Sequence, residues 1–462
     1  MENLLTLAER YDVAAPRYTS YPTAASFNRA VGPAQLAAAI ERTNEDAVPG
    51  PVELYIHIPF CHSLCYYCAC NRTVTRNSAR VRRYMDQLVS EGEVLAPLLA
   101  SGREVSKIHL GGGTPTYLPP AALGKLMQGL ERTFPLAPAS RREGAVEVDP
   151  RTVTADDIGA LRALGFTRLS FGVQDMDPKV QAAINRVQPF EMVADLTAAV
   201  RHEGFRSLNF DLIYGLPHQT VERFDRTLDQ VLELAPDRIA LYGYAHLPER
   251  FRAQRLLRSQ ALPSGRTRLA ILVHAIQRLS AAGYEYIGMD HFARPDDGLA
   301  QGRRAQTLIR DFQGYEPGPH TDLIGLGVSA ISSLGGMYAQ NRKGLREWEA
   351  AVAAGGITTE RGYALDADDR LRRDVIEAIM CRDRVPFAEF EDRHDIDFRR
   401  YFADALPRLD ALEADGLVRC DEGELQITPR GRLFLRAIAM CFDAYLGRQT
   451  QPGAAPRYSR VV

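Results

Sequence analysis

The chain has 462 residues, of which 45% are hydrophobic and 25% charged, and its formal net charge is −2 at pH 7. This length allows several domains, or one large α/β barrel with an appendage. The composition excludes a disordered chain, because disorder needs low hydrophobicity and high net charge. A net charge close to zero also argues against a protein that holds nucleic acid or anionic lipid nonspecifically.

The start of the chain and its uncharged stretches predict neither secretion nor a membrane span. The first five residues carry an acid and lack the cationic and apolar segments of a secretion signal. The uncharged stretch 323–341 contains four glycines, so we expect packed loops and turns there. Of the seven cysteines, four crowd between residues 61 and 70, which is unlike a disulfide framework. We therefore expect a reducing, cytoplasmic location.

Residues 1–50 are expected to form an N-terminal arm, and residues 51–290 alternate between strand-like and helix-like segments. In the arm, the two prolines of 16–23 indicate an ordered segment and not a helix. Six later segments are rich in β-branched and aromatic residues, at 53–60, 107–110, 145–148, 168–173, 208–214 and 238–244. Amphipathic stretches such as 81–95, 122–133 and 224–234 separate them. This alternation predicts an α/β fold with a parallel sheet and right-handed crossovers.

The strand pattern fades from about residue 365. We expect helices at 366–379, 387–390, 397–414 and 429–446, and a small hairpin formed by 416–418 and 425–427. Helices combined with a hairpin are typical of a winged helix, a shape that does not by itself make a DNA reader. The expected order is therefore a barrel extension and linker at 291–364, then a mostly helical, winged-helix-like C-terminal domain at 365–462.

The chemically unusual residues gather at the ends of the strand-like segments. The clustered cysteines, the glycines at 111–113, Glu147, Gln174 and Asp211 lie in the second half of a strand or just after it. Ligands bind at that edge of the sheet in α/β barrels and open α/β sheets. The position of these residues in the predicted fold thus agrees with their chemical type.

Three cysteines with the spacing Cys61-x3-Cys65-x2-Cys68 directly follow the first strand. Structural zinc normally takes two ligand pairs from separate segments, and the sequence has no second CxxC or HxxxH pair. The spacing favours a [4Fe–4S] cluster held by three cysteines, with one iron open to substrate or cofactor. A zinc site with Cys70 as an awkwardly spaced fourth ligand, and a set of unrelated thiols, stay open as alternatives.

This spacing is the signature of the radical S-adenosylmethionine (SAM) superfamily, and further motifs sharpen the resemblance. They are PRYTSYPT at 16–23, YIHIPFC at 55–61, GGGTP at 111–115, EVDP at 147–150, FGVQ at 171–174, DLIYGLP at 211–217, YAHLP at 244–248 and GMDHFA at 288–293. In this order, from the arm to residues 441–443, the chain resembles the oxygen-independent coproporphyrinogen III oxidases. The resemblance implies a partial (β/α)6 radical-SAM barrel with an N-terminal arm and a mostly helical C-terminal domain.

The same resemblance implies an oxidoreductase of haem biosynthesis that converts two propionates of coproporphyrinogen III to vinyls, giving protoporphyrinogen IX. The [4Fe–4S] cluster would pass an electron to SAM, and the 5′-deoxyadenosyl radical so formed would take a hydrogen atom from the β-carbon of a propionate. Loss of CO2 and of one electron to an unidentified acceptor would leave the vinyl. A reducing electron donor is also implied, nucleic acid is not, and we expect a monomer.

By motif match, the resemblance implies three groups of site residues, while the catalytic residues stay unassigned. Cys61, Cys65 and Cys68 would ligate the cluster, and Cys70 would not. Tyr55, Gly112, Glu147 and Ile331 would lie near the first SAM, where Glu147 would accept bonds from ribose hydroxyls. A second SAM would contact Tyr67, Gly113, Thr114, Gln174, Arg186, Asp211 and Ala245.

The sequence also suggests roles for several residues outside these three groups. Arg17 and Arg294 are candidates for holding substrate propionates, since Arg is the best-shaped partner of a carboxylate. His57 and His246 are either core histidines with satisfied hydrogen bonds or site residues. We expect Trp348 to serve packing, and we expect buried, small apolar groups at Cys381, Cys420 and Cys441.

Two other functions stay open. A haem-binding chaperone of the same superfamily would share the barrel and the cluster but move haem without oxidising porphyrinogen; Cys70, the arm and the segment 288–293 oppose it. A zinc-stabilised regulator would place the winged-helix-like segment on DNA; the net charge and the single cysteine cluster oppose it.

Overall fold

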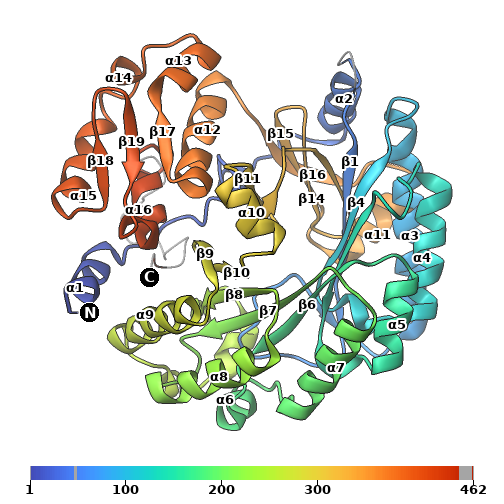
Figure 1. Cartoon of the computed structure of the whole chain (residues 1–462). Helices are drawn as coiled ribbons and strands as arrows, with labels where there is room; N and C mark the ends of the chain where they lie inside the picture. Colours follow the sequence, from blue (N-terminus) through green and yellow to red (C-terminus); the bar gives the residue numbers. More distant parts are fainter. Residues whose placement is uncertain (1, 46–48, 447–459, 461–462) are drawn as a thin grey trace.

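The computed structural model describes residues 2–45, 49–446 and 460. The parts of the predicted arm and C-terminal domain at 1, 46–48, 447–459 and 461–462 lie outside the described residues. Within the described chain, one curved sheet has the strand order β16-β15-β14-β13-β1-β4-β5-β6-β7-β8-β10-β9 (Figure 1). Its centre is formed by the six predicted strands, all parallel: β1 (Val52–Ile58), β4 (Val105–Gly112), β5 (Glu143–Val148), β6 (Arg168–Gln174), β7 (Ser207–Tyr214) and β8 (Arg238–Gly243). The expected α/β fold with a partial barrel is confirmed.

Differences at the strand ends have local causes. The first strand, predicted to run to residue 60, ends at Ile58, because Pro59 has no N–H to continue the ladder. The next residues form a separate short strand, β2 (Phe60–Cys61), which pairs in parallel with β3 (Thr73–Val74). The loop between these two strands is thereby fastened at both ends.

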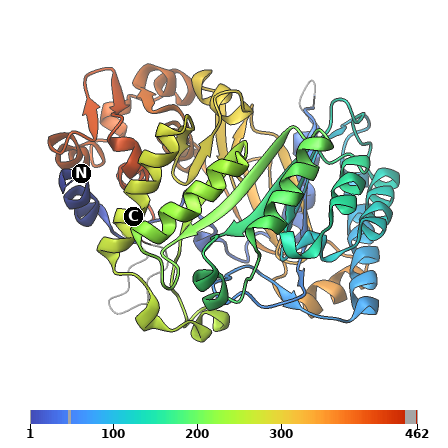
Figure 2. The same cartoon turned by 60° about the horizontal axis from the view of Figure 1, so that its bottom comes forward.

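Helices cover the convex face of the sheet (Figures 1 and 2). They are α3 (Ser78–Leu95), α4 (Pro120–Thr133), α5 (Ala155–Ala163), α7 (Phe190–His202), α8 (Val221–Leu234) and α9 (Gly265–Ala281), each in contact with the next, and the short α6 (Pro178–Ala183) follows β6. In α8, Thr220 caps the first turn by accepting from the N–H of Arg223, and Phe224, Leu228 and Val231 recur at helical intervals as the buried face. Amphipathic periodicity therefore sets which side of each helix meets the sheet.

The segment 322–364 extends one end of the sheet and corrects one expectation. β13 (Asp322–Leu326) pairs in parallel with β1, and β14 (Ile331–Leu334), β15 (Met337–Asn341) and β16 (Thr359–Ala364) continue the sheet antiparallel. The stretch 323–341, expected to be loops and turns, is thus mainly strand. Three of its four glycines lie in the connecting turns, where Gly327 and Gly335 have φ values of +97° and +57°, a conformation that favours glycine, whereas Gly325 lies within β13. Helix α11 (Leu345–Ala353) follows and packs against α3.

At the other end of the sheet, β10 (His291–Ala293) and β9 (Glu285–Gly288) pair antiparallel beyond β8. Helix α10 (Gly298–Arg304) and a hairpin of β11 (Leu308–Asp311) and β12 (Gly314–Pro317) come next, and β11 contacts α12 (Ala367–Arg382) of the C-terminal domain. This hairpin therefore connects the barrel with the C-terminal domain.

The arm crosses between the barrel and the C-terminal domain. Helices α1 (Glu2–Tyr11) and α2 (Pro33–Thr43) flank residues 16–23, which form no helix, as predicted. The Tyr18 hydroxyl donates to Asp443 at 3.0 Å, and the Tyr338 hydroxyl donates to the carbonyl of Tyr21 at 3.3 Å. In Figure 1, α1 lies beneath the C-terminal domain and close to α9, with which it is in contact.

The C-terminal domain combines helices with a small sheet, as the sequence predicts. Its elements are α12 (Ala367–Arg382), β17 (Arg384–Pro386), α13 (Phe387–His394), α14 (Phe398–Tyr401), α15 (Asp410–Ala414), β18 (Val418–Cys420), β19 (Glu424–Ile427), the 3-10 turn η8 (Gly431–Phe434) and α16 (Leu435–Met440). The helix predicted over 397–414 is broken, because Pro407 cannot donate a backbone hydrogen bond. The helix predicted over 429–446 is shorter, since it begins only after the turn η8. In the part of the chain that the structure describes, no helix combines the length and apolarity that a membrane crossing needs.

Candidate functional site

The cysteine loop, residues 61–73, runs from the last residue of β2 to the first residue of β3, shortly after β1 ends. Cys61 and Cys65 are each 8% exposed, Cys68 is half-buried and Cys70 is exposed, and all four are free thiols. Because the pairing of β2 with β3 closes the loop, its thiols are carried on a fixed turn at the carboxyl edge of the sheet.

The cysteine loop forms a wall of a pocket of about 380 Å³, which we call the thiol pocket. Most of the predicted site residues line it: Cys61, Cys65, Tyr67, Cys68, Gly112, Gly113, Thr114, Glu147, Gln174, Arg186 and Asp211. These residues come from the ends of β1 and β4–β7 and from the segments that follow. Parallel strands bring their carboxyl ends to one edge, and this is why residues far apart in the chain meet here.

Tyr55 lies outside the thiol pocket, within β1. Its hydroxyl is 3.2 Å from Nδ1 of His57, and its ring centroid is 5.7 Å from that of His109. His57 is 7% exposed, and its Nε2 is 2.9 Å from the carbonyl oxygen of Asn71. Burial lowers the pKa of His57. His57 is therefore a core histidine with satisfied hydrogen bonds that supports the cysteine loop.

Ile331 and Ala245 also lie outside the thiol pocket. Ile331 begins β14, which is separated from β1 by β13. Ala245 follows β8 and lines a second cavity. The buried amide of Gln254 joins that region to the cysteine loop, because its Nε2 donates to the carbonyls of Tyr67 at 3.0 Å and of Ala245 at 3.1 Å.

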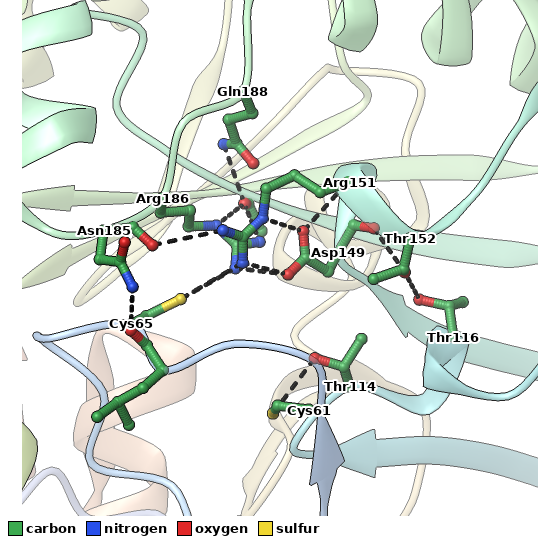
Figure 3. A network of polar contacts seen from close by, with 12 residues as sticks. Cys61, Cys65, Thr114, Thr116, Asp149, Arg151, Thr152, Asn185, Arg186 and Gln188 are labelled. Carbon is green, nitrogen blue, oxygen red and sulfur yellow. Dashed lines mark hydrogen bonds and ion pairs between the residues drawn. The ribbon is translucent and has the colours of Figure 1, made fainter. Parts of the chain in front are cut away.

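Arg186 connects Cys65 with Asp149 (Figure 3). Its Nη1 donates to Oδ2 of Asp149 at 2.9 Å and to Sγ of Cys65 at 3.6 Å. Nη2 of Arg151 donates to the same two atoms, at 2.7 Å and 3.5 Å. Burial would raise the pKa of Asp149, but the charges and hydrogen bonds of Arg186 and Arg151 lower it. Two guanidinium groups thus share one carboxylate, which leaves positive charge beside Cys65.

Sequence reasoning did not select Asp149 or Arg151 as site residues. Asp149 had a detectable signal, because it lies two positions after Glu147 at the end of a strand, where alternate residues point to the same face. Arg151 had none, because the 3-10 turn that begins at Pro150 directs its side chain back toward Cys65.

The thiols provide a donor set that fits an iron–sulfur cluster. Burial raises the pKa of Cys61 to about 11, so this thiol would lose its proton only on binding metal, and Oγ1 of Thr114 lies 3.5 Å from its sulfur. Arginine N–H groups beside Cys65 are the kind of donor that stabilises cluster sulfurs. Across the described ranges, no group of three His, Cys, Asp or Glu side chains has the arrangement to hold a metal ion. The fit to a cluster rests on the shared pocket and on the chemistry of the donors.

Glu147 lies at the end of β5 as an ionised acceptor. Its Oε2 accepts from the backbone N–H of Gly112 at 3.1 Å, and its Oε1 lies 3.5 Å from Nε2 of His109. Burial would raise the pKa of Glu147, but His109 and the N–H of Gly112 lower it. Gly112 has a φ of +118°, and a Cβ there would lie 2.7 Å from the His57 ring. The glycine therefore permits both the backbone conformation and the close approach.

Asp211 accepts hydrogen bonds from two neighbours on the barrel interior. Oγ of Ser170 and Nδ2 of Asn209 each donate to it at 2.9 Å. Burial and, next, the negative charge of Glu147 raise the pKa of Asp211 to about 6. At neutral pH this part of the pocket therefore presents two carboxylates as hydrogen-bond acceptors.

The remaining residues that the sequence singled out differ in their burial and in their surroundings. Arg17 lines the cavity that also contains Ala245 and His246, whereas Arg294 pairs with Asp296 at 3.7 Å and is 45% exposed. Trp348 is fully buried and donates to Glu91 at 3.0 Å, which confirms a packing role. Among the distant cysteines, the buried state predicted for all of them holds for Cys381 and Cys441; Cys420 is only half-buried, because it lies at the end of the outer strand β18.

Comparison with known proteins identifies the family. Residues 55–231 match the family described as Radical SAM superfamily, and residues 365–434 match the HemN C-terminal domain. The chain is 47% identical to the oxygen-independent coproporphyrinogen III oxidase of Escherichia coli (strain K12) over 458 residues, 99% of this chain and 98% of the relative. It is 44% identical to the oxidase of that name from Pseudomonas aeruginosa over 456 residues, again 99% and 98% of the two chains.

A solved structure agrees with this relationship. The coproporphyrinogen III oxidase (HemN) from Escherichia coli, described as a radical SAM enzyme, superposes with a TM-score of 0.89 at 47% identity and covers 93% of this chain and 98% of its own. The fold, the thiol pocket and these similarities agree, and the chain belongs to the oxygen-independent coproporphyrinogen III oxidase family of the radical SAM superfamily.

Proposed function

We propose that this chain converts coproporphyrinogen III to protoporphyrinogen IX without oxygen, by oxidative decarboxylation of two propionates to vinyl groups. The observation that carries the function is the thiol pocket, in which free thiols, two arginines and strand-end carboxylates meet at the carboxyl edge of the barrel. Similarity over nearly the whole chain to two oxidases of that name supports the same reaction.

Cys61, Cys65 and Cys68 would hold the [4Fe–4S] cluster in this proposal. When bound and reduced, the cluster and SAM supply a 5′-deoxyadenosyl radical that removes a hydrogen atom from the β-carbon of a propionate. The chain's own contribution is to bind, orient and shield the reactants. Arg186 and Arg151, which donate toward Cys65, would stabilise negative charge at this sulfur.

The thiol pocket and its surroundings offer two sets of contacts for SAM. The first set is Tyr55, Gly112, Glu147 and Ile331, and the ionised carboxylate of Glu147 is suited to accept from ribose hydroxyls. The second set is Tyr67, Gly113, Thr114, Gln174, Arg186, Asp211 and Ala245. Its support is the guanidinium of Arg186, which suits the carboxylate of a methionine moiety, and the bridge that Gln254 makes between Tyr67 and Ala245.

The arm and the C-terminal domain would close the site during the reaction, because a carbon radical reacts with most molecules that reach it. The hydrogen bonds from Tyr18 to Asp443 and from Tyr338 to the carbonyl of Tyr21 support this role, since they tie the arm to both neighbouring parts. We further propose that the protein acts as a cytoplasmic monomer with a separate reducing donor and a separate electron acceptor.

An assay on the reconstituted protein in an oxygen-free chamber tests the function. Reductant, SAM and coproporphyrinogen III are added, with cell extract as the source of acceptor, and vinyl-bearing product and 5′-deoxyadenosine are followed. Both products should appear in proportion. SAM cleavage without vinyl product on a protein with an intact cluster would reject the oxidase, and haem binding in the same preparation would then indicate a haem chaperone. Zinc without sulfide would reject the radical mechanism altogether.

A further inference from the structure

Three segments at the cysteine loop carry nearly all their charge as arginine and lysine. They are residues 71–83, 249–258 and 342–347, which contain five, four and three basic residues, with two glutamates as their only acids. The whole chain has 56 basic and 58 acidic residues, so the three segments hold a strong local excess in a protein of almost no net charge. We call these three segments the basic surface.

Contacts around the cysteine loop bring the three segments together. The first segment begins inside the loop and continues into α3, which packs against α11 (Figure 1). Nδ2 of Asn71 donates to the carbonyl of Lys343 at 3.1 Å, which joins the first segment to the third. In the second segment, Nε2 of Gln254 donates to the carbonyl of Tyr67 in the loop at 3.0 Å. Burial, and then the charges of neighbouring arginines that include Arg250, lower the pKa of Lys343, so the second and third segments also lie near each other.

Most cations of the basic surface point to solvent. Arg76, Arg252 and Lys343, one from each segment, are exposed, and none of the three forms an ion pair with a carboxylate in the described part of the chain. Arg80 differs, because its Nε lies 3.4 Å from Oε1 of Glu349. A surface with such an excess of one sign attracts a partner of the opposite sign.

Exposed apolar side chains lie beside these charges. Of the five large hydrophobic side chains that are exposed in the described chain, three belong to segments that contact the cysteine loop, and they are 47%, 58% and 54% exposed: Val74, Val187 and Leu256. Val74 pairs with Cys61 across β2 and β3, Val187 follows Arg186, whose guanidinium donates to the loop, and Leu256 lies in the second basic segment. Exposed apolar groups next to polar ones are typical of a protein interaction site.

The position of the basic surface indicates the kind of partner that it fits. Ala69 and Cys70 are exposed, so the loop that carries the proposed cluster ligands reaches the surface here. A donor protein must dock beside this loop, because an electron crosses between two proteins only where their redox centres come close together. Complexes of electron carriers bury small interfaces, and opposite charges guide their encounter. Nucleic acid fits less well, since its phosphate contacts would leave the exposed valine and leucine side chains without a role.

We propose that the basic surface docks an acidic one-electron carrier protein, which is the reducing donor of this enzyme. This inference rests on the proposed function and deepens it, because it names the chemical class of the donor and its docking site. The reduced carrier gives one electron to the cluster and is itself oxidised by one electron; no bond forms or breaks, and no proton moves. Exposed cations such as Arg76 and Lys343 attract the carboxylates of the carrier, and the exposed valine and leucine side chains contact apolar atoms around its redox centre.

Electron delivery by an acidic carrier tests this proposal. The cluster-loaded protein is mixed with SAM and a reduced plant-type ferredoxin in an oxygen-free chamber, and the initial rate of 5′-deoxyadenosine formation is measured at rising salt concentration. The rate should fall steeply with salt, because salt screens the attraction between the two proteins. Arg76→Gln combined with Lys343→Gln should lower the rate at low salt by about tenfold and should weaken its dependence on salt.

The matched control is Lys125→Gln combined with Arg206→Gln. It removes the same two charges from exposed positions on α4 and at the amino end of β7, and it should behave as the unmodified protein does. With dithionite, a small reductant that needs no docking surface, all these proteins should cleave SAM at the same rate. Cluster absorption and the thermal midpoint report whether each variant folds, and Arg82→Gln combined with Arg252→Gln repeats the test at other exposed positions of the basic surface.

Several results would overturn the proposal. One is a ferredoxin that fails to bind the unmodified protein at low salt, and another is an equal ferredoxin-driven rate in the Arg76 and Lys125 double variants. A raised KM for coproporphyrinogen III with an unchanged ferredoxin-driven rate would assign the basic surface to the propionates of the substrate. An RNA oligonucleotide that binds more tightly than the ferredoxin, and loses binding in the Arg76 double variant, would assign it to nucleic acid.

The outcomes also separate this inference from the proposed function. If dithionite supports vinyl formation and the ferredoxin-driven rate does not depend on the basic surface, the inference fails and the function stands. If the ferredoxin binds through Arg76 and Lys343, measured by titration calorimetry, but no vinyl product forms with either reductant, the function fails and the docking surface stands.

Discussion

Arg186 donates to the Sγ of Cys65 at 3.6 Å although 121 positions separate the two residues in the chain. The same guanidinium holds Asp149, and Arg151 repeats both contacts from the end of β5. The proposed cluster site therefore includes a shell of fixed positive charge that the cysteine motif alone does not reveal.

Replacing Arg186 should affect SAM binding more than cluster assembly. Arg186→Gln removes one of two partners of buried Asp149, which should lower the free energy of unfolding by about 3 kcal/mol. It also removes the cation proposed to hold the second SAM carboxylate. The number of SAM molecules bound per cluster, measured by equilibrium dialysis, should fall from two to one. Arg151→Gln is the matched control, because it removes the other partner of Asp149 and should keep both molecules; equal stoichiometry in the two variants would contradict the assignment.

The clustered cysteines should divide into ligands and one bystander. Changing Cys61, Cys65 or Cys68 to Ala should each abolish the cluster absorption and turnover, because each removes one of the three proposed thiolate ligands. Cys70→Ala should keep the iron and sulfide content while lowering activity, since Cys70 is the exposed member of the group. Iron and acid-labile sulfide analysis checks this prediction. If Cys70→Ala loses the iron, the three-ligand assignment is wrong.

Gly112→Ala should damage the site through a steric contact as well as through backbone strain. A Cβ at this position would lie 2.7 Å from the His57 ring, and the positive φ adds a cost of about 1–3 kcal/mol. Gly102→Ala is the control for strain alone, since Gly102 has a φ of +90° and nothing within 4 Å of the added Cβ. Only the Gly112 variant should lose SAM cleavage, measured as 5′-deoxyadenosine formed with reductant. Equal loss in both would point to strain and not to the site.

Glu91 should make the stability of the protein depend on pH. This carboxyl is 1% exposed and accepts from the backbone N–H of Gly327 and from the side chains of Asn341 and Trp348, and burial raises its pKa to about 7. Because the folded-state pKa lies above that of the unfolded chain, the folded protein binds the proton more tightly. This contribution to stability is fully present below the unfolded pKa and is lost as the pH rises through about 7.

The measurement for Glu91 is the urea midpoint at a series of pH values. Between pH about 5 and about 8, the unmodified protein should lose up to about 3 kcal/mol through this group. Glu91→Gln cannot ionise, so the difference in unfolding free energy between variant and unmodified protein should change across this window. A constant difference would show that Glu91 does not titrate there.

Sequence alone determined the parts of this protein that depend on local pattern. The six central strands could be predicted because alternating apolar segments and amphipathic helices specify a parallel sheet, and parallel order places the strand ends at one edge. The cysteine loop could be found in the sequence because its three proposed ligands lie within eight residues. Local pattern also produced the wrong prediction at 323–341. Glycines in the tight turns indicated loops there, although the short buried strands β13–β15 lie between those turns.

Only the tertiary structure decided the contacts between distant segments. No local pattern pairs Arg17 of the arm with Asp290 after β9, or brings Arg436 of the C-terminal domain beside them. The sequence therefore could not choose between Arg17 and Arg294, whereas the fold places the first, half-buried, in the wall of a cavity and leaves the second 45% exposed. The physical reason is that a charged side chain acquires its role from the groups that surround it after folding, and those groups come from parts of the chain whose meeting depends on the packing of whole domains.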